Sequence, residues 1–196
     1  MARIASLFAT QIYRAELGAA ANSDLAKVCL AIARDDTAGQ RWAKTHDYRG
    51  YTSYASLNDL PRRAPEFADL KAQIGRHVRV FARALQFTSS RLELDSMWIN
   101  VMAPDGVHGG HIHPHAALSG TYYVALPRGA SAIRFEDPRL GLMMAAPAKK
   151  ENAHNKPFVT MAPKSGTLLL WESWLRHDVP QNAARGKRIS VSFNYR

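Results

Sequence analysis

The chain carries the stretch His108-Gly-Gly-His-Ile-His-Pro-His115 shortly before the strand-like run Ser119-Gly-Thr-Tyr-Tyr-Val-Ala-Leu126. Four of the eight histidines of the protein lie in that first stretch. The run that follows contains β-branched and aromatic residues, which fit the pleated surface of a sheet. The two segments together predict a metal site at the entrance to a β-strand.

The sequence that surrounds this stretch has a pattern typical of an all-β region. From Leu92 onward, short β-prone segments are divided by Gly, Pro and Asn, a pattern typical of an antiparallel sandwich or barrel. Pro163-Lys-Ser-Gly166 has the composition of a tight turn, and segment 137–157, with three prolines, is predicted to be a long loop. We expect strands at 92–103, 119–126, 131–136, 158–162, 166–171 and 187–195.

The first 90 residues are predicted to be mainly helical after a short opening strand. Ser23 and Asp24 can cap a helix in which apolar residues recur at a spacing near 3.6. A second helix, over 67–86, follows Pro65 and carries a continuous apolar stripe that we expect to pack against a sheet. The stripe consists of Phe67, Leu70, Ile74, Val78, Phe81 and Leu85.

Length and composition indicate one compact domain over 1–196, of the α+β class but mainly β. We expect a helical support region at 1–90 and a β core at 91–196. The single cysteine, Cys29, cannot form an internal disulfide, and neither a signal peptide nor a membrane span is evident, so a cytoplasmic protein is expected. The net charge of +10 favours anionic partners, but the basic residues are scattered, so a dedicated nucleic-acid role is not preferred.

The histidine cluster has the chemistry of an open metal site. Residues two apart in an extended segment project from the same face, so His111 and His113 can both reach one ion. His177, from a distant segment, can supply a third imidazole and leave the remaining coordination positions free for substrate and oxygen. Such openness distinguishes catalytic from structural sites.

A second motif predicts an anion site. Arg188-Ile-Ser190 begins eleven residues after His177, and its spacing places the guanidinium and the hydroxyl on one face of a strand. Arginine is suited to bidentate recognition of a planar carboxylate. An anionic co-substrate is therefore expected close to the metal.

At these residues the chain resembles the Fe(II)/2-oxoglutarate-dependent oxygenases, and more closely a largely uncharacterised bacterial branch within the prolyl-hydroxylase-like superfamily. The resemblance spans about residues 98–195 and implies a double-stranded β-helix core of the jelly-roll or cupin-like type. It is carried by Trp98-Ile-Asn-Val101, His111-Ile-His-Pro114, Ser119-Gly-Thr-Tyr-Tyr-Val124, Phe135-Glu-Asp-Pro-Arg139, Trp174-Leu-Arg-His-Asp-Val-Pro180 and Arg188-Ile-Ser-Val-Ser-Phe-Asn194.

The resemblance implies oxidative decarboxylation of 2-oxoglutarate by molecular oxygen, coupled to hydroxylation of a substrate that the sequence does not identify. The positive charge is compatible with an anionic substrate. The implied Fe(II) ligands and catalytic residues are His111, His113 and His177. The implied 2-oxoglutarate-binding residues are Arg188, for the carboxylate remote from the metal, together with Ser190, Tyr123 and Asn100.

The chain departs from the superfamily at His113, where most members have a carboxylate. Three neutral imidazoles leave the full divalent charge on the metal, which alters metal preference. His115 or His108 is an alternative for the second ligand position.

Two other functions also fit the sequence. The first is a cupin-like three-histidine dioxygenase that does not use 2-oxoglutarate and has no need of Arg188-x-Ser190. The second is a non-enzymatic basic barrel that binds nucleic acid or an acidic protein through helix 67–86 and the loop around Lys149-Lys150.

Overall fold

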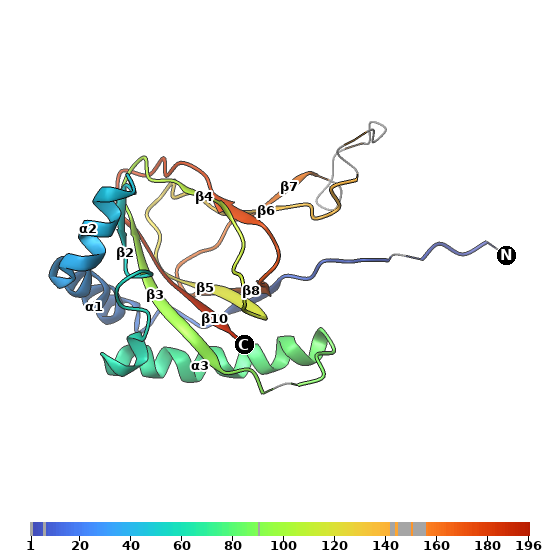
Figure 1. The fold of residues 1–196 in the computed structure, drawn as a ribbon, viewed down its shortest axis with the longest axis horizontal. Coiled ribbons are helices and arrows are strands. Elements are labelled where there is room, and N and C mark those ends of the chain that lie inside the picture. Colours follow the sequence, from blue (N-terminus) through green and yellow to red (C-terminus); the bar gives the residue numbers. More distant parts are fainter. Residues whose placement is uncertain (1, 6, 90, 142–143, 145–149, 151–155) are drawn as a thin grey trace.

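The computed structural model describes residues 2–5, 7–89, 91–141, 144, 150 and 156–196. Two antiparallel sheets form the centre of the molecule, and helices cover the outer face of the larger one (Figure 1). The large sheet has the order β1 (Tyr13–Glu16), β8 (Thr167–Glu172), β5 (Leu118–Ala125), β10 (Arg188–Tyr195), β3 (Leu94–Met102) and β2 (Gly50–Thr52). The small sheet has the order β4 (His108–His111), β9 (His177–Val179), β6 (Ile133–Glu136) and β7 (Phe158–Met161).

The helices are α1 (Asn22–Asp35), α2 (Thr37–Thr45) and α3 (Pro65–Ala84), with a short 3₁₀ turn at Leu60–Arg62. The apolar stripe predicted for the second helix lies in the core against the large sheet, which confirms that prediction. Cys29 on α1 is buried in the same core. None of the helices in the described part of the chain combines the length and apolar character of a membrane span.

Side chains of the central strands alternate between two environments. On β10, Ile189, Val191 and Phe193 belong to the core shared with the helices, whereas Arg188 and Ser190 point to the other face. On β8, Leu168 and Leu170 face the helices while Leu169 and Trp171 join a second cluster with Ile133 and Phe135 of the small sheet. This period of two places the polar residues of β10 in the space between the sheets.

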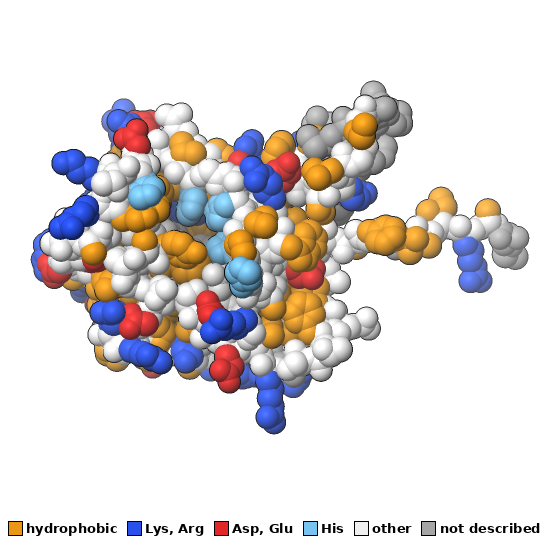
Figure 2. All heavy atoms as spheres, in the orientation of Figure 1, with side chains coloured by type: hydrophobic (Ala, Val, Ile, Leu, Met, Phe, Trp, Pro, Cys, Tyr) orange, Lys and Arg blue, Asp and Glu red, His pale blue; other side chains and the backbone are white. Residues whose placement is uncertain are grey.

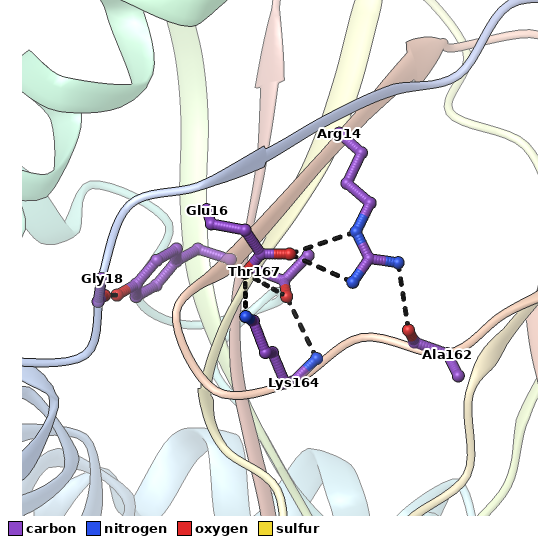
Figure 3. Close-up of polar contacts among 7 residues, drawn as sticks. Arg14, Glu16, Gly18, Ala162, Lys164 and Thr167 are labelled. Carbon is purple, nitrogen blue, oxygen red and sulfur yellow. Dashed lines mark hydrogen bonds and ion pairs between the residues drawn. The ribbon is translucent and has the colours of Figure 1, made fainter.

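The opening strand β1 is fixed at the edge of the large sheet by polar contacts with β8 and the turn before it. Arg14 donates to Glu16 and to the carbonyl of Ala162, and the hydroxyl of Thr167 also donates to Glu16 (Figure 3). The predicted turn connects β7 to β8 and ends at Gly166, whose φ of 89° and close approach to Gly18 leave no room for a Cβ. The turn prediction is confirmed.

Several local predictions differ from the structure. The helix expected to be capped by Ser23 and Asp24 instead begins at Asn22, before both of these residues, and its N-terminus has no side-chain cap. Asn22 instead donates to the carbonyl of Val124 and accepts from the hydroxyl of Tyr122, so it ties α1 to β5. The elements α2, β2, β4 and β9 were not predicted. Residues 142–143, 145–149 and 151–155 of the predicted loop lie outside the described residues.

Candidate metal centre

Three imidazoles meet at the edge of the small sheet. His111, the last residue of β4, is the register partner of His177 on β9, and His113 lies two residues beyond β4. The potential ligand atoms of the three rings all lie within 4.8 Å of one another. The face drawn in Figure 2 shows histidine side chains gathered around a hollow. The structure therefore brings together the three histidines that the sequence singled out.

Backbone carbonyls fix the protonation of two of these rings. Nδ1 of His111 donates to the carbonyl oxygen of Gly109 at 2.8 Å, and Nδ1 of His177 donates to that of Leu175 at 2.9 Å. A carbonyl can only accept, so the proton of each neutral ring is on Nδ1 and the lone pair is on Nε2. A partner of this kind on the remote nitrogen is the usual support for a metal-bound histidine.

The spacing of the donor atoms fits a divalent metal. Nε2 of His113 lies 3.3 Å from Nε2 of His177. Two imidazole nitrogens bound at ~2.1 Å to one ion, at right-angled to tetrahedral angles, lie ~3.0–3.4 Å apart. His113 is held in this position by its backbone N–H, which donates to the carbonyl of Ser173, and by the ring of Trp98, which stacks on it. The donor set fits Fe(II), which imidazole ligates well.

Burial keeps these rings neutral. It lowers the pKa of His113 to about 3 and that of His177 to about 4, and the neighbouring imidazoles add to the shift. The pKa of His111 is also lowered, again mainly by burial. Neutral imidazoles are the form that binds metal, so at pH 7 no proton has to be displaced before an ion enters.

The two alternative ligands lie outside this trio. His115 is exposed and has a left-handed backbone with φ 66°. His108 is on β4 and lines the pocket, and its ring stacks on that of His111 at a centroid distance of 4.6 Å. Among the described residues, the three histidines whose ring nitrogens lie close enough together to share one ion include His113 but neither His108 nor His115. The geometry favours His113 as the second ligand, and its role as a ligand remains a prediction.

The choice between His113 and His115 can be tested by a matched pair of variants. His113→Ala is expected to weaken binding of Fe(II) or Ni(II) by about 100-fold or more, because it removes one of three ligands. Loss of a group that only hydrogen-bonds to a metal ligand already weakens metal binding by about 10- to 100-fold. His115→Ala should leave the metal Kd unchanged. Anaerobic isothermal titration calorimetry measures both values. The reverse result, with His115 as the sensitive position, would make our choice of ligand wrong.

A row of polar side chains on the large sheet faces the histidines. Ser190 on β10 is the register partner of Asn100 on β3 and of Tyr123 on β5. These three residues, proposed from the sequence to bind the co-substrate, are therefore neighbours across three strands. Arg188 lies two residues before Ser190 on the same face and lines the same pocket. The sequence spacing identified this face correctly because strand side chains alternate.

Arg188 is a buried cation. It is 3% exposed; Nε donates to the carbonyl of Ser131 and Nη1 to the hydroxyl of Ser190, each at 3.2 Å. Its guanidinium lies over the ring of Tyr123, whose own hydroxyl is buried without a hydrogen-bond partner among the described residues. No ion pair of Arg188 with an acidic side chain occurs within the described ranges. An isolated buried charge is unfavourable, and an anion bound at Arg188 would offset that cost.

The same pocket has further lining residues, and several of them, including Thr121 and Ser192, were not proposed from the sequence. Asn100 donates to Ser192, which bonds to Thr121, and Asn100 accepts from Thr52. This series of hydrogen bonds continues the row of polar side chains along β10. The same two-residue spacing that singled out Ser190 could have singled out Ser192. Among the described residues that line the pocket, none is acidic. The further lining residues are Trp98, His108, Thr121, Ile133, Trp171, Val179 and Ser192.

Comparison with known families agrees with this geometry. Residues 96–194, half of the chain, match a family model described as "Putative 2OG-Fe(II) oxygenase". The chain belongs to this family. The protein is accordingly an oxygenase of a family that uses Fe(II), 2-oxoglutarate and molecular oxygen, and the resemblance noted in the sequence is confirmed. No curated protein matches the chain.

Solved structures of this oxygenase superfamily share the fold. A prolyl-4-hydroxylase from Pseudomonas putida is 14% identical, with 95% of this chain and 92% of that chain covered and a TM-score of 0.64. The collagen prolyl hydroxylase vCPH of Paramecium bursaria Chlorella virus-1, in complex with 2-oxoglutarate, is 10% identical, with 94% of each chain covered and a TM-score of 0.60. HygX from Streptomyces hygroscopicus, with nickel, 2-oxoglutarate and hygromycin B bound, is 16% identical, with 95% and 82% covered and a TM-score of 0.59. At these identities the likeness concerns the fold.

Proposed function

We propose that the protein hydroxylates an organic substrate, using Fe(II) bound by His111, His113 and His177 and 2-oxoglutarate anchored by Arg188. The two facing sheets form a double-stranded β-helix in this proposal, with the metal at the edge of the small sheet. Ser190, Tyr123 and Asn100 line the co-substrate site on the large sheet.

The observation that carries the proposal is that one pocket contains both the three histidines and Arg188, which is buried and has no acidic partner among the described residues. 2-Oxoglutarate has a keto-acid end that can chelate a metal and a second carboxylate that can pair with a guanidinium. The fork geometry of Arg188 suits that carboxylate. Neither half of the pocket alone would distinguish this co-substrate from other ligands.

Charge balance supports a dianionic co-substrate. The three imidazoles are neutral and the described lining residues include no acid, so a bound divalent metal and Arg188 together bring three positive charges into the pocket. The two carboxylates of 2-oxoglutarate offset two of them. A neutral ligand would leave all three charges buried, which is costly at low dielectric.

Bound Fe(II) supplies the redox chemistry by which one atom of O₂ enters succinate and the other the substrate, with release of carbon dioxide. The chain supplies orientation and exclusion of water. Backbone acceptors at Gly109 and Leu175 aim Nε2 of two histidines at the metal position. Trp98 and Trp171 pack against His113 and His177 and restrict water on that side.

The two rival functions make different forecasts. A cupin-like dioxygenase would need the histidines but has no use for Arg188, whose burial without an acid partner then lacks a reason. A nucleic-acid-binding barrel would bind in a salt-dependent manner that chelators do not affect. Part of the basic surface invoked for it, Lys149, lies outside the described residues.

Anaerobic titration of the Fe(II) protein with 2-oxoglutarate tests the proposal. We expect a weak visible charge-transfer band from bidentate chelation, saturating with the co-substrate, and succinate formation after admission of air. Succinate, an analogue without the keto group, should give no band. If neither the band nor succinate formation is observed, the 2-oxoglutarate assignment is wrong.

A further inference from the structure

Tyr48 lies at the side of the pocket that is built by the N-terminal half of the chain. It follows α2, and its backbone N–H donates to the carbonyl of Ala43. Its ring lies 6.4 Å from that of Trp42 and meets the ring of His108 edge-on at 5.9 Å, both between centroids. Tyr48 is thus positioned against a residue that lines the pocket.

The hydroxyl of Tyr48 is buried and has no hydrogen-bond partner among the described residues. Burial raises the pKa of Tyr48 to about 12, and the positive charge of Arg188 opposes that rise. The hydroxyl of Tyr123 is also buried, and both the charge of Arg188 and an interaction of that hydroxyl with the guanidinium oppose the rise that burial causes in its pKa. Two buried phenolic hydroxyls therefore lie within the electrostatic reach of one buried guanidinium.

A ligand with negative oxygen atoms satisfies all three groups together. A buried hydroxyl without a partner is unfavourable, and a phenol can donate one hydrogen bond to an anion. A carboxylate has about four lone-pair positions, enough for the arginine fork and two phenolic donors. The known contacts of Arg188, to Ser131 and Ser190, use Nε and one hydrogen of Nη1 and leave donors free.

We propose that the Tyr48 hydroxyl is a third donor to the carboxylate that Arg188 binds, so that the N-terminal half of the chain completes the co-substrate site. This inference rests on the proposed function and names a residue outside the segment 96–194 that the family model matches. Tyr48 stands two residues before Gly50 of β2, whose register partner on β3, Met102, is also the register partner of Arg188 on β10. It had no sequence signal, because this alignment depends on pairing between strands far apart in the chain. It acts here as a binding residue and takes no part in the redox step.

The test compares two variants that each remove one unpartnered buried hydroxyl. Tyr48→Phe should raise the Kd for 2-oxoglutarate about 10-fold, the effect of a hydrogen bond to a charged group. Tyr195→Phe is the matched control, because its hydroxyl is also buried and unpartnered but its ring belongs to the core on the helix side of the sheet. The measurement is anaerobic calorimetry on the Ni(II)-loaded protein, which needs no turnover.

A second ligand separates direct contact from a general disturbance of the site. 2-Oxopentanoate keeps the keto-acid end and lacks the second carboxylate, so Tyr48→Phe should leave its Kd unchanged. Equal Kd values for 2-oxoglutarate in wild type and Tyr48→Phe would overturn the inference while leaving the proposed function intact. A similar loss for 2-oxopentanoate, or for Tyr195→Phe, would also overturn it. Failure of Tyr48→Phe to fold would count against it too, because an unpartnered hydroxyl is not needed for folding.

A different result of the same measurements would contradict the proposed function. If the wild-type Ni(II) protein binds 2-oxoglutarate no better than 2-oxopentanoate, no carboxylate is recognised at Arg188. Both the function and the role of Tyr48 would then be wrong.

Discussion

Arg188→Met is expected to weaken 2-oxoglutarate binding by at least about 30-fold, because it removes one partner of a buried ion pair, a change that costs about 2–5 kcal/mol or more. Metal binding should be unaffected, since Arg188 is on β10 and the histidines come from β4, β9 and the segment after β4. Calorimetry with the Ni(II)-loaded protein gives the 2-oxoglutarate Kd, and the metal Kd is measured separately.

Arg134→Met is the matched control for this variant. Arg134 also points from a strand, but it pairs with Asp178 and lies over the ring of Phe158 on the small sheet. Its loss should leave the 2-oxoglutarate Kd within about twofold, because Arg134 is not among the described residues that line the pocket. An unchanged Kd for 2-oxoglutarate in Arg188→Met would mean that Arg188 does not bind 2-oxoglutarate, and our assignment of this residue would be wrong.

Stability measurements on Arg188→Met provide an independent check. The guanidinium is buried without an acidic partner among the described residues, so the ligand-free wild type bears a desolvation cost that methionine removes. The lost hydrogen bonds to Ser131 and Ser190 act in the opposite direction. The variant should therefore remain folded, so a loss of 2-oxoglutarate binding can be assigned to the site.

His177→Ala is expected to abolish specific metal binding. His177 is buried and its Nε2 is within 3.3 Å of that of His113, so its removal leaves two ligands and an empty volume beside Trp171. A metal present at about 100 times its Kd stabilises a protein by about 2.7 kcal/mol, and this increment should disappear. The measurement is the shift in Tm on addition of Ni(II).

The metal-dependent shift in Tm should persist in a His46→Ala protein. His46 is an exposed histidine at the end of α2, so this variant has the same residue change without a ligand loss. Persistence of the full shift in His177→Ala would mean that metal binds mainly through other residues. His108 would then be the first to examine, because it stacks on His111.

Much of the β region could be predicted because strand side chains alternate. The long strands β3, β5, β8 and β10 contain β-branched and aromatic residues and overlap the predicted segments. The short strands β4 and β9 are His-Gly-Gly-His and His-Asp-Val, and apart from Val179 their residues have little strand propensity. Tertiary pairing forms these strands, and they position two of the three candidate ligands.

The sequence by itself determined which residue types are available and which of them share a strand face. The spacing of Arg188 and Ser190, and the placement of polar residues opposite the helix-facing core of β10, follow from a period of two that is local to the chain. The tertiary structure decided which distant groups meet. It brought His113, and not His115, next to His111 and His177, placed the protons of His111 and His177 on Nδ1 through backbone carbonyls, and brought Tyr48 beside His108. These relations depend on register and packing between elements far apart in sequence, which no local pattern encodes.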